Sequence, residues 1–102
     1  MEEFDKLIGG SKPTLVDFYA TWCGPCKMQS PILEQLKQTV GDKATIIKVD
    51  IDRNEELANR YRVQSVPTLI IFQNGEPVWR ASGLHQAADL EAKINETLVH
   101  HD

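Results

Sequence analysis

One stretch of the chain decides its fold, TLVDFYATWCGPCK at residues 14–27. Its first six residues favour a β-strand and are apolar on both faces except at Asp17, which is typical of a strand buried inside a parallel sheet. The hydrophobic period becomes helical after Cys26, so Cys23 stands at the boundary between that strand and a helix. The stretch therefore predicts an α/β fold with a cysteine pair at the junction of two elements.

The two cysteines, three positions apart at a helix start, form a chemically reactive pair. The unpaired N–H groups of the first helical turn and the helix dipole favour an anion, so we expect the thiolate of Cys23 to be stabilised as a nucleophile. The sulfur of Cys26 is close enough to form a disulfide with Cys23 and to attack a mixed disulfide there. Gly24 and Pro25 lie between the cysteines. Proline suits a first helical turn because it needs no N–H there, and it stiffens the short ring that the disulfide closes.

Two other interpretations of the pair are packed thiols and half of a zinc site. Tetrahedral zinc requires four nitrogen or sulfur ligands. The chain has no second cysteine pair, and His85, His100 and His101 are all distant in sequence. The spacing therefore favours a redox pair that needs neither a metal nor an organic cofactor.

The rest of the chain alternates between helical and strand patterns. We expect helices over 2–8, from Cys26 to a stop at Gly41, over 54–61 and after Gly83, and strands over 14–19, 44–51, 68–72 and 77–81. Such alternation implies a mostly parallel sheet with helices on both faces, closed by an antiparallel hairpin at Asn74-Gly75. The helix after Cys26 should bury a stripe of Met28, Ile32, Leu33, Leu36 and Val40.

Composition restricts the class of protein. With 102 residues, 41% of them hydrophobic and 25% charged, the chain fits a single globular domain over residues 1–102. A net charge of −4 provides no basic surface for a phosphate backbone, so we expect no nucleic-acid partner. Residues 1–5 do not resemble a signal peptide, and no apolar run reaches the length of a membrane span. We expect a cytoplasmic monomer without membrane contact.

The run VDFYATWCGPCK at 16–27, followed by Pro31 and by Val66-Pro67-Thr68, resembles the thioredoxin family over roughly residues 14–99. The resemblance implies a thioredoxin fold and a dithiol that reduces disulfide-containing target proteins and is recharged by a thioredoxin reductase. Cys23 would attack the target and Cys26 would release it. Two alternatives are a disulfide oxidase or isomerase on the same fold, which the Gly-Pro dipeptide disfavours, and a structural subunit of a complex.

The resemblance also assigns residues around the pair. Asp17 matches a buried carboxylate that exchanges a proton with the resolving cysteine, and desolvation of a carboxyl group in an apolar strand should raise its pKa. The alternative is a tolerated buried aspartate with a hydrogen-bond partner. Pro67 matches a cis-proline facing the disulfide, which leaves the backbone of Val66 free to pair with an extended substrate segment. The alternative is an ordinary trans proline before a strand.

Three further positions each have two interpretations. Trp22 either covers part of the site or belongs to the core. Gly83 either borders the substrate groove, as the resemblance implies, or serves the turn before the last helix. Lys48 matches a family lysine near the buried carboxylate, but its charge also suits the protection of a sheet edge.

The chain departs from the family pattern at its beginning and at Tyr19, where a second tryptophan is common. Only 22 residues precede Cys23, and no β-rich run comes before the first helix. We therefore expect four strands instead of five, with segment 44–51 at the edge of the sheet, protected by Lys48, Asp50 and Asp52. We expect His100 and His101 to form a solvated tail.

Overall fold

A four-stranded mixed sheet in the order β2-β1-β3-β4 forms the centre of the computed structural model, which describes residues 2–99. The strands are β1 (Thr14–Tyr19), β2 (Thr45–Asp50), β3 (Thr68–Gln73) and β4 (Glu76–Ser82). Strand β2 runs parallel to β1, whereas β3 is antiparallel to both β1 and β4. The four-stranded sheet and the edge position of β2 are confirmed. His100 and His101 lie outside the described residues.

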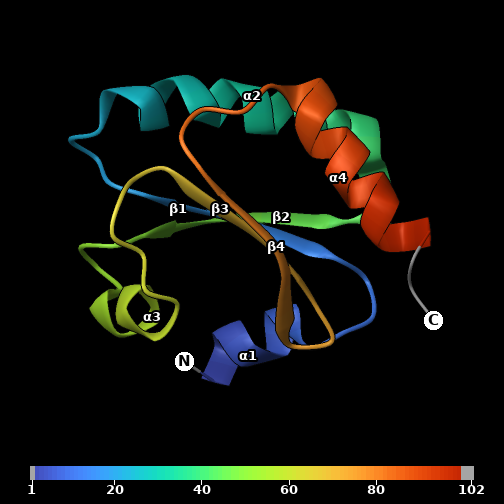
Figure 1. Cartoon of the computed structure of the whole chain (residues 1–102), viewed down its shortest axis with the longest axis horizontal. Coiled ribbons are helices and arrows are strands. Elements are labelled where there is room, and N and C mark those ends of the chain that lie inside the picture. The colour runs from blue at the N-terminus through green and yellow to red at the C-terminus, as the bar shows by residue number, and fades with distance from the viewer. Residues whose placement is uncertain (1, 100–102) are drawn as a thin grey trace.

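The helices cover both faces of the sheet, as expected (Figure 1). They are α1 (Glu2–Ile8), α2 (Gly24–Val40), α3 (Glu55–Arg60) and α4 (Ala87–Val99), with a 3-10 turn η1 (Gly41–Lys43) after α2. Helices α2 and α4 lie together on one face, and α1 and α3 lie on the other (Figure 1). None of these helices, within residues 2–99, is long and apolar enough to cross a bilayer. Asn74 and Gly75 both have positive φ, which confirms the two-residue hairpin.

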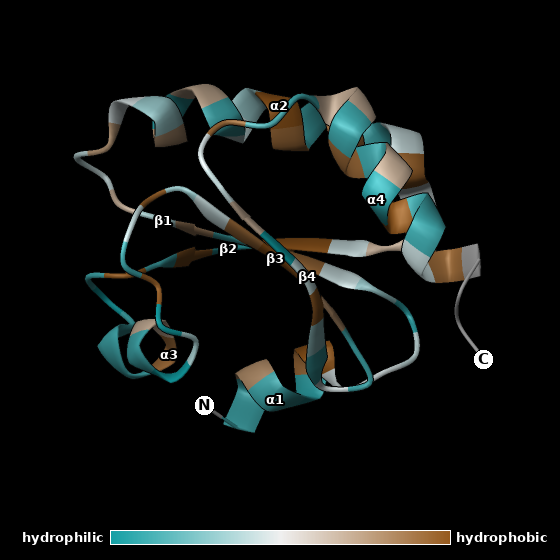
Figure 2. Cartoon of the chain, in the orientation of Figure 1, coloured by the Kyte–Doolittle hydropathy of each residue, from teal (hydrophilic) through white to brown (hydrophobic). Residues whose placement is uncertain are grey.

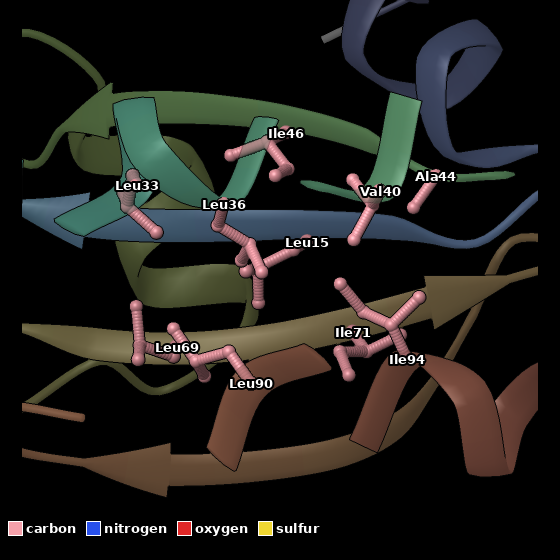
Figure 3. Packing of buried hydrophobic residues seen from close by; sticks show 10 residues of the cluster. All are labelled: Leu15, Leu33, Leu36, Val40, Ala44, Ile46, Leu69, Ile71, Leu90 and Ile94. Atoms are coloured by element: carbon pink, nitrogen blue, oxygen red, sulfur yellow. The ribbon is translucent and has the colours of Figure 1, made fainter. Parts of the chain in front are cut away.

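A hydrophobic core fills the space between the sheet and helices α2 and α4. Figure 3 shows its side chains pointing toward one another from both helices and from three strands. The cluster consists of Leu15, Leu33, Leu36, Val40, Ala44, Ile46, Leu69, Ile71, Leu90 and Ile94. The hydrophobic colours in Figure 2 mark parts of the strands and of these helices, while hydrophilic residues cover much of α1 and α3. This core holds the helix that carries the cysteines against the sheet.

A second core on the opposite face explains why β1 is apolar on both sides. Val16 and Phe18 of β1 pack there with Phe72 of β3. The rings of Tyr61 and Phe72 meet edge-on, with their centres 5.0 Å apart. Side chains alternate between the faces of a strand, so Asp17 shares the α2 side of the sheet with Leu15. The one charge of β1 is therefore directed toward the helix of the cysteines.

The predicted hydrophobic stripe of α2 is confirmed at Leu33, Leu36 and Val40, but it is wrong at Met28. Met28 is not in the core but 60% exposed, and the polar Gln29 is 0% exposed in its place. The buried positions follow the helical spacing of three and four residues, from Cys26 through Gln29 to Leu33 and beyond. Met28 lies beside that stripe. It was predicted to be buried because Met28 and Ile32 have helical spacing and are both hydrophobic, whereas Gln29 is polar.

Candidate active site

Cys23 and Cys26 form a disulfide at the start of α2, with their Cα atoms 5.3 Å apart. Cys23 is the N-terminal cap of the helix, and the N–H of Cys26 donates to its Sγ at 3.2 Å. Pro25 lies in the first turn, where its missing N–H costs nothing. The sulfur of Cys23 thus occupies the place where the helix dipole and free N–H groups stabilise a negative charge. This arrangement suits a thiolate that appears when the disulfide is reduced.

Both cysteines are shielded from solvent and approached by backbone from the other half of the chain. Cys23 is 5% exposed and Cys26 is 3% exposed, and they pack with Ala20 and Val66. The Sγ of Cys23 lies 3.6 Å from the carbonyl oxygen of Val66. The Val66–Pro67 peptide bond is cis, as the resemblance implied. The loop before β3 therefore lies directly against the reactive sulfur.

Gly83 lies beside this loop. Its N–H donates to the carbonyl of Pro67 at 2.9 Å, and its φ of +88° is a backbone conformation that glycine adopts without strain. Helix α4 begins four residues later, at Ala87. The geometry is compatible with both sequence interpretations, because the residue precedes the helix and borders Pro67.

Trp22 lies on the surface beside the disulfide, which rules out the core interpretation. It is 68% exposed, and its Nε1–H donates to a carboxylate oxygen of Asp52 at 3.0 Å. Together with Ile51 and Val66 it lines a surface hollow of about 320 Å³ whose other lining residues are Val63, Gln64 and Ser65. A concave and largely uncharged surface therefore adjoins the reactive sulfur.

Asp17 is fully buried, and neither carboxylate oxygen has a hydrogen-bond partner among the described residues. No protein group among the described residues is therefore the hydrogen-bond partner that the alternative interpretation expects. Burial raises the pKa of Asp17 to about 6, against a smaller opposing effect from the positive charge of Lys48. An unpartnered carboxyl group that titrates near neutral pH is suited to proton exchange.

Lys48 lies on the edge strand and also beside Asp17, its register partner across β1 and β2. Its Nζ donates to Ser30 Oγ at 2.9 Å and lies 4.5 Å from the ring centre of Tyr19. These contacts hold the cation above the α2 side of the sheet. The position of Lys48 is compatible with both interpretations, because it lies on the edge strand and beside Asp17.

A second hollow of about 330 Å³ opens beside Lys48. It is lined by Tyr19, Ala20, Thr21, Cys26, Lys27, Ser30 and Lys48. The hollow gives solvent an approach to Cys26, the more buried of the two cysteines, from the side where Lys48 lies. Within residues 2–99, no three histidine, cysteine or acidic side chains gather in a way that would hold a metal ion.

The comparison with known families decides the identity of this arrangement. The family model named Thioredoxin matches residues 1–96. The chain belongs to the thioredoxin family. It is a thiol–disulfide oxidoreductase, a disulfide reductase whose redox-active pair is Cys23–Cys26.

Other thioredoxins resemble this one along most of its length. A thioredoxin-like protein of Synechocystis is 49% identical, over 84% of this chain and 82% of its own. A bifunctional thioredoxin reductase/thioredoxin of Mycobacterium leprae is 42% identical over 93% of this chain, which corresponds to 21% of that protein. The structure of a mutant thioredoxin from Halobacterium salinarum matches 95% of this chain and 84% of its own, with a TM-score of 0.87 and 38% identity.

Sequence reasoning missed two polar partners of the thioredoxin site. Asp52 was expected only to protect the sheet edge, but it accepts the hydrogen bond of the Trp22 indole. Ser30 had no assigned role, but it accepts a hydrogen bond from Lys48. Both contacts join residues far apart in the sequence, and neither position belongs to a hydrophobic period or a motif that would have indicated it.

Proposed function

We propose that this thioredoxin takes electrons from a thioredoxin reductase and passes them to exposed disulfides of other proteins. The observation that supports it most is the place of Cys23, whose sulfur caps α2 and faces the carbonyl of Val66. In the Mycobacterium leprae relative, a reductase and a thioredoxin are named in one protein. A reductase partner is consistent with that combination.

The proposed cycle consists of two thiol–disulfide exchanges. The Cys23 thiolate attacks one sulfur of the target disulfide, forming a mixed disulfide and releasing the other target sulfur as a thiolate. Cys26, once deprotonated, attacks the Sγ of Cys23 and expels the second target sulfur. The target gains two electrons, and Cys23 and Cys26 end as a disulfide that the reductase must reduce again. No metal and no organic cofactor takes part in these steps.

Asp17 is the proposed proton acceptor for Cys26. Its carboxylate lies on the same side of the sheet as α2, and its raised pKa of about 6 leaves it ionised but basic at neutral pH. The hollow lined by Lys48 and Cys26 gives solvent an approach to the Cys26 side of this pair, while Asp17 itself is buried. Asp17 would return the proton to solvent after the mixed disulfide is resolved.

The proposed binding surface for targets is the groove that contains the cis peptide bond. An extended target segment would pair with the backbone of Val66 by strand addition, because Pro67 has no N–H to pair. The exposed ring of Trp22 and the apolar hollow beside it would contact side chains of the target. Gly83, without a side chain, would leave the opposite border of Pro67 open.

We also propose that residues 1–102 act as a single monomeric domain in the cytoplasm. A close cysteine pair that must return to its dithiol form suits a compartment that keeps thiols reduced. The exposed edge strand carries Lys48, and the Asn54 side chain donates to the carbonyl of Asp50 at its end. Both features discourage pairing of β2 with a second chain.

Trapping with Cys26→Ser tests the proposed cycle. The variant should accumulate target proteins bound to Cys23 by disulfides, because the second exchange is blocked. Cys23→Ser is the matched control and should trap nothing. Absence of reducible adducts on Cys26→Ser would contradict the mechanism, whereas targets that still bind the double Cys→Ser variant would indicate the structural role.

A further inference from the structure

Gln29 is a polar side chain in a position where α2 otherwise buries apolar groups. It lies one turn beyond Cys26 and is fully buried. Its Nε2 donates to the carbonyl of His85 at 2.9 Å, and its Oε1 accepts from the N–H of the same residue, also at 2.9 Å. One amide side chain thus binds both backbone groups of one residue, 56 positions away in the sequence.

The residue that Gln29 binds belongs to the segment between β4 and α4. His85 Nδ1 lies 2.9 Å from the carbonyl of Gly83, which can only accept, so Nδ1 donates. The N–H of Gly83 in turn donates to the carbonyl of Pro67. A continuous chain of hydrogen bonds therefore leads from α2 through His85 and Gly83 to the cis-proline loop. That loop contacts the sulfur of Cys23, so the chain ends at the reactive site.

This arrangement does more than fill space in the core, because Gln29 and the backbone of His85 satisfy each other's hydrogen bonds. Burying an amide group costs about 1–3 kcal/mol unless its hydrogen bonds are satisfied. An apolar side chain such as the neighbouring Leu33 would fill the same space without that requirement. What the amide adds is direction, because its two bonds fix both the position and the orientation of the His85 backbone. Residues 83–86 belong to no helix or strand that would otherwise fix them.

We propose that Gln29 is a positioning residue for the recognition of polypeptide disulfides. By holding His85, it keeps Gly83 against Pro67 and so fixes one border of the groove in which the target backbone lies. The inference rests on the proposed groove function of Val66 and Pro67. It distinguishes substrate classes: a target segment bound along the groove depends on Gln29, whereas a small disulfide that reaches Cys23 alone depends on it much less.

Gln29→Met tests this inference, because methionine keeps the length of the side chain and lacks both hydrogen-bonding groups. Wild type and variant are assayed on one protein with disulfides, insulin, and on one small aromatic disulfide, dithiobis(nitrobenzoate). We expect the ratio of kcat/KM for insulin to that for the small disulfide to fall about tenfold, mainly through KM, as expected when binding interactions are lost. Gln38→Met, at an exposed position of the same helix, is the matched control and should leave the ratio unchanged.

The ratio does not depend on the folded fraction of a sample, since both substrates report on the same molecules. If Gln29→Met folds too poorly to assay, Gln29→Asn, which keeps the amide but is one methylene too short to make both hydrogen bonds, should lower the ratio about threefold. Hydrogen exchange of the His85 N–H should accelerate in either variant. An unchanged ratio, or equal losses on both substrates, would overturn the positioning role. A wild type that reduces the small disulfide but not insulin would overturn the proposed function instead.

Discussion

At the scale of single residues, burial of the ionised Asp17 carboxylate lowers the stability of the fold at neutral pH. Its pKa is 3.8 in an unperturbed carboxyl group and about 6 here, so the folded protein holds this proton more tightly than the unfolded chain. The stability that the protonated form provides is complete below about pH 4 and is lost as the pH rises through 6. At neutral pH the ionised, buried carboxylate costs about 3 kcal/mol.

Asp17→Asn should therefore stabilise the protein at pH 7 by about 2 kcal/mol, less than the full cost because the amide is also buried without partners. The gain over wild type should shrink toward zero at pH 4. Urea unfolding of both proteins across this pH range measures it. The same variant should resolve mixed disulfides at least about tenfold more slowly near neutral pH, because Cys26 loses its base. Unchanged kinetics would contradict the proton-transfer role.

Lys48→Met separates the two roles of that lysine. Removing the positive charge beside Asp17 should raise the pKa of the carboxyl group above about 6, since Lys48 opposes the effect of burial. The carboxyl carbon of Asp17, followed by NMR during a pH titration, reports this directly. Lys43→Met, which removes an exposed charge in η1, is the control and should leave the titration in place. A pKa of Asp17 that does not rise in Lys48→Met would leave edge protection as the only role.

Reactive residues that stand out from their immediate neighbours in the sequence were predictable. The cysteine pair and the buried carboxylate of β1 follow from a spacing and from one charge in an apolar run. Gln29 and Asp52 were not predictable as partners of His85 and Trp22, because these contacts depend on how distant segments meet. No periodic pattern encodes such a contact.

At the scale of elements, α2 is held in place by its buried stripe. Leu36 is completely buried between the sheet and α4, so Leu36→Ala should destabilise the fold by about 3 kcal/mol through lost burial and the cavity that remains. Met28→Ala, at an exposed position of the same helix, should lower the stability by less than about 0.5 kcal/mol. Urea unfolding of the two variants gives the comparison. Equal losses of stability in the two variants would contradict the burial of Leu36 and the exposure of Met28.

The same helix shows where sequence patterns reach their limit. The existence and order of the helices and strands follow from hydrophobic period and turn residues, and their ends agree within one or two positions. The burial of Gln29 instead of Met28 does not follow, because hydrophobicity alone favours Met28 as the buried residue. The partner of the buried Gln29 is His85, in the segment before α4, and the hydrophobic pattern of α2 holds no information about that segment.

At the scale of the whole molecule, the fold brings together segments that are remote in sequence around one sulfur atom. Strand β1 leads to the disulfide, the loop before β3 supplies Val66 and Pro67, and the segment after β4 supplies Gly83. The two cores fix these segments from opposite faces of the sheet. Among the described residues, β2 is one edge of the sheet, and β1, which leads to the cysteines, lies between β2 and β3.

The central claim is that the Cys23–Cys26 pair donates electrons to disulfides. Equilibration with a dithiol buffer of known potential, followed by counting free thiols, tests it most directly, with Cys23→Ser as the control that cannot cycle. We expect a reduction potential close to the value characteristic of thioredoxins, about −270 mV. A potential of about −180 mV or higher, in the range of disulfide isomerases and oxidants, would contradict it.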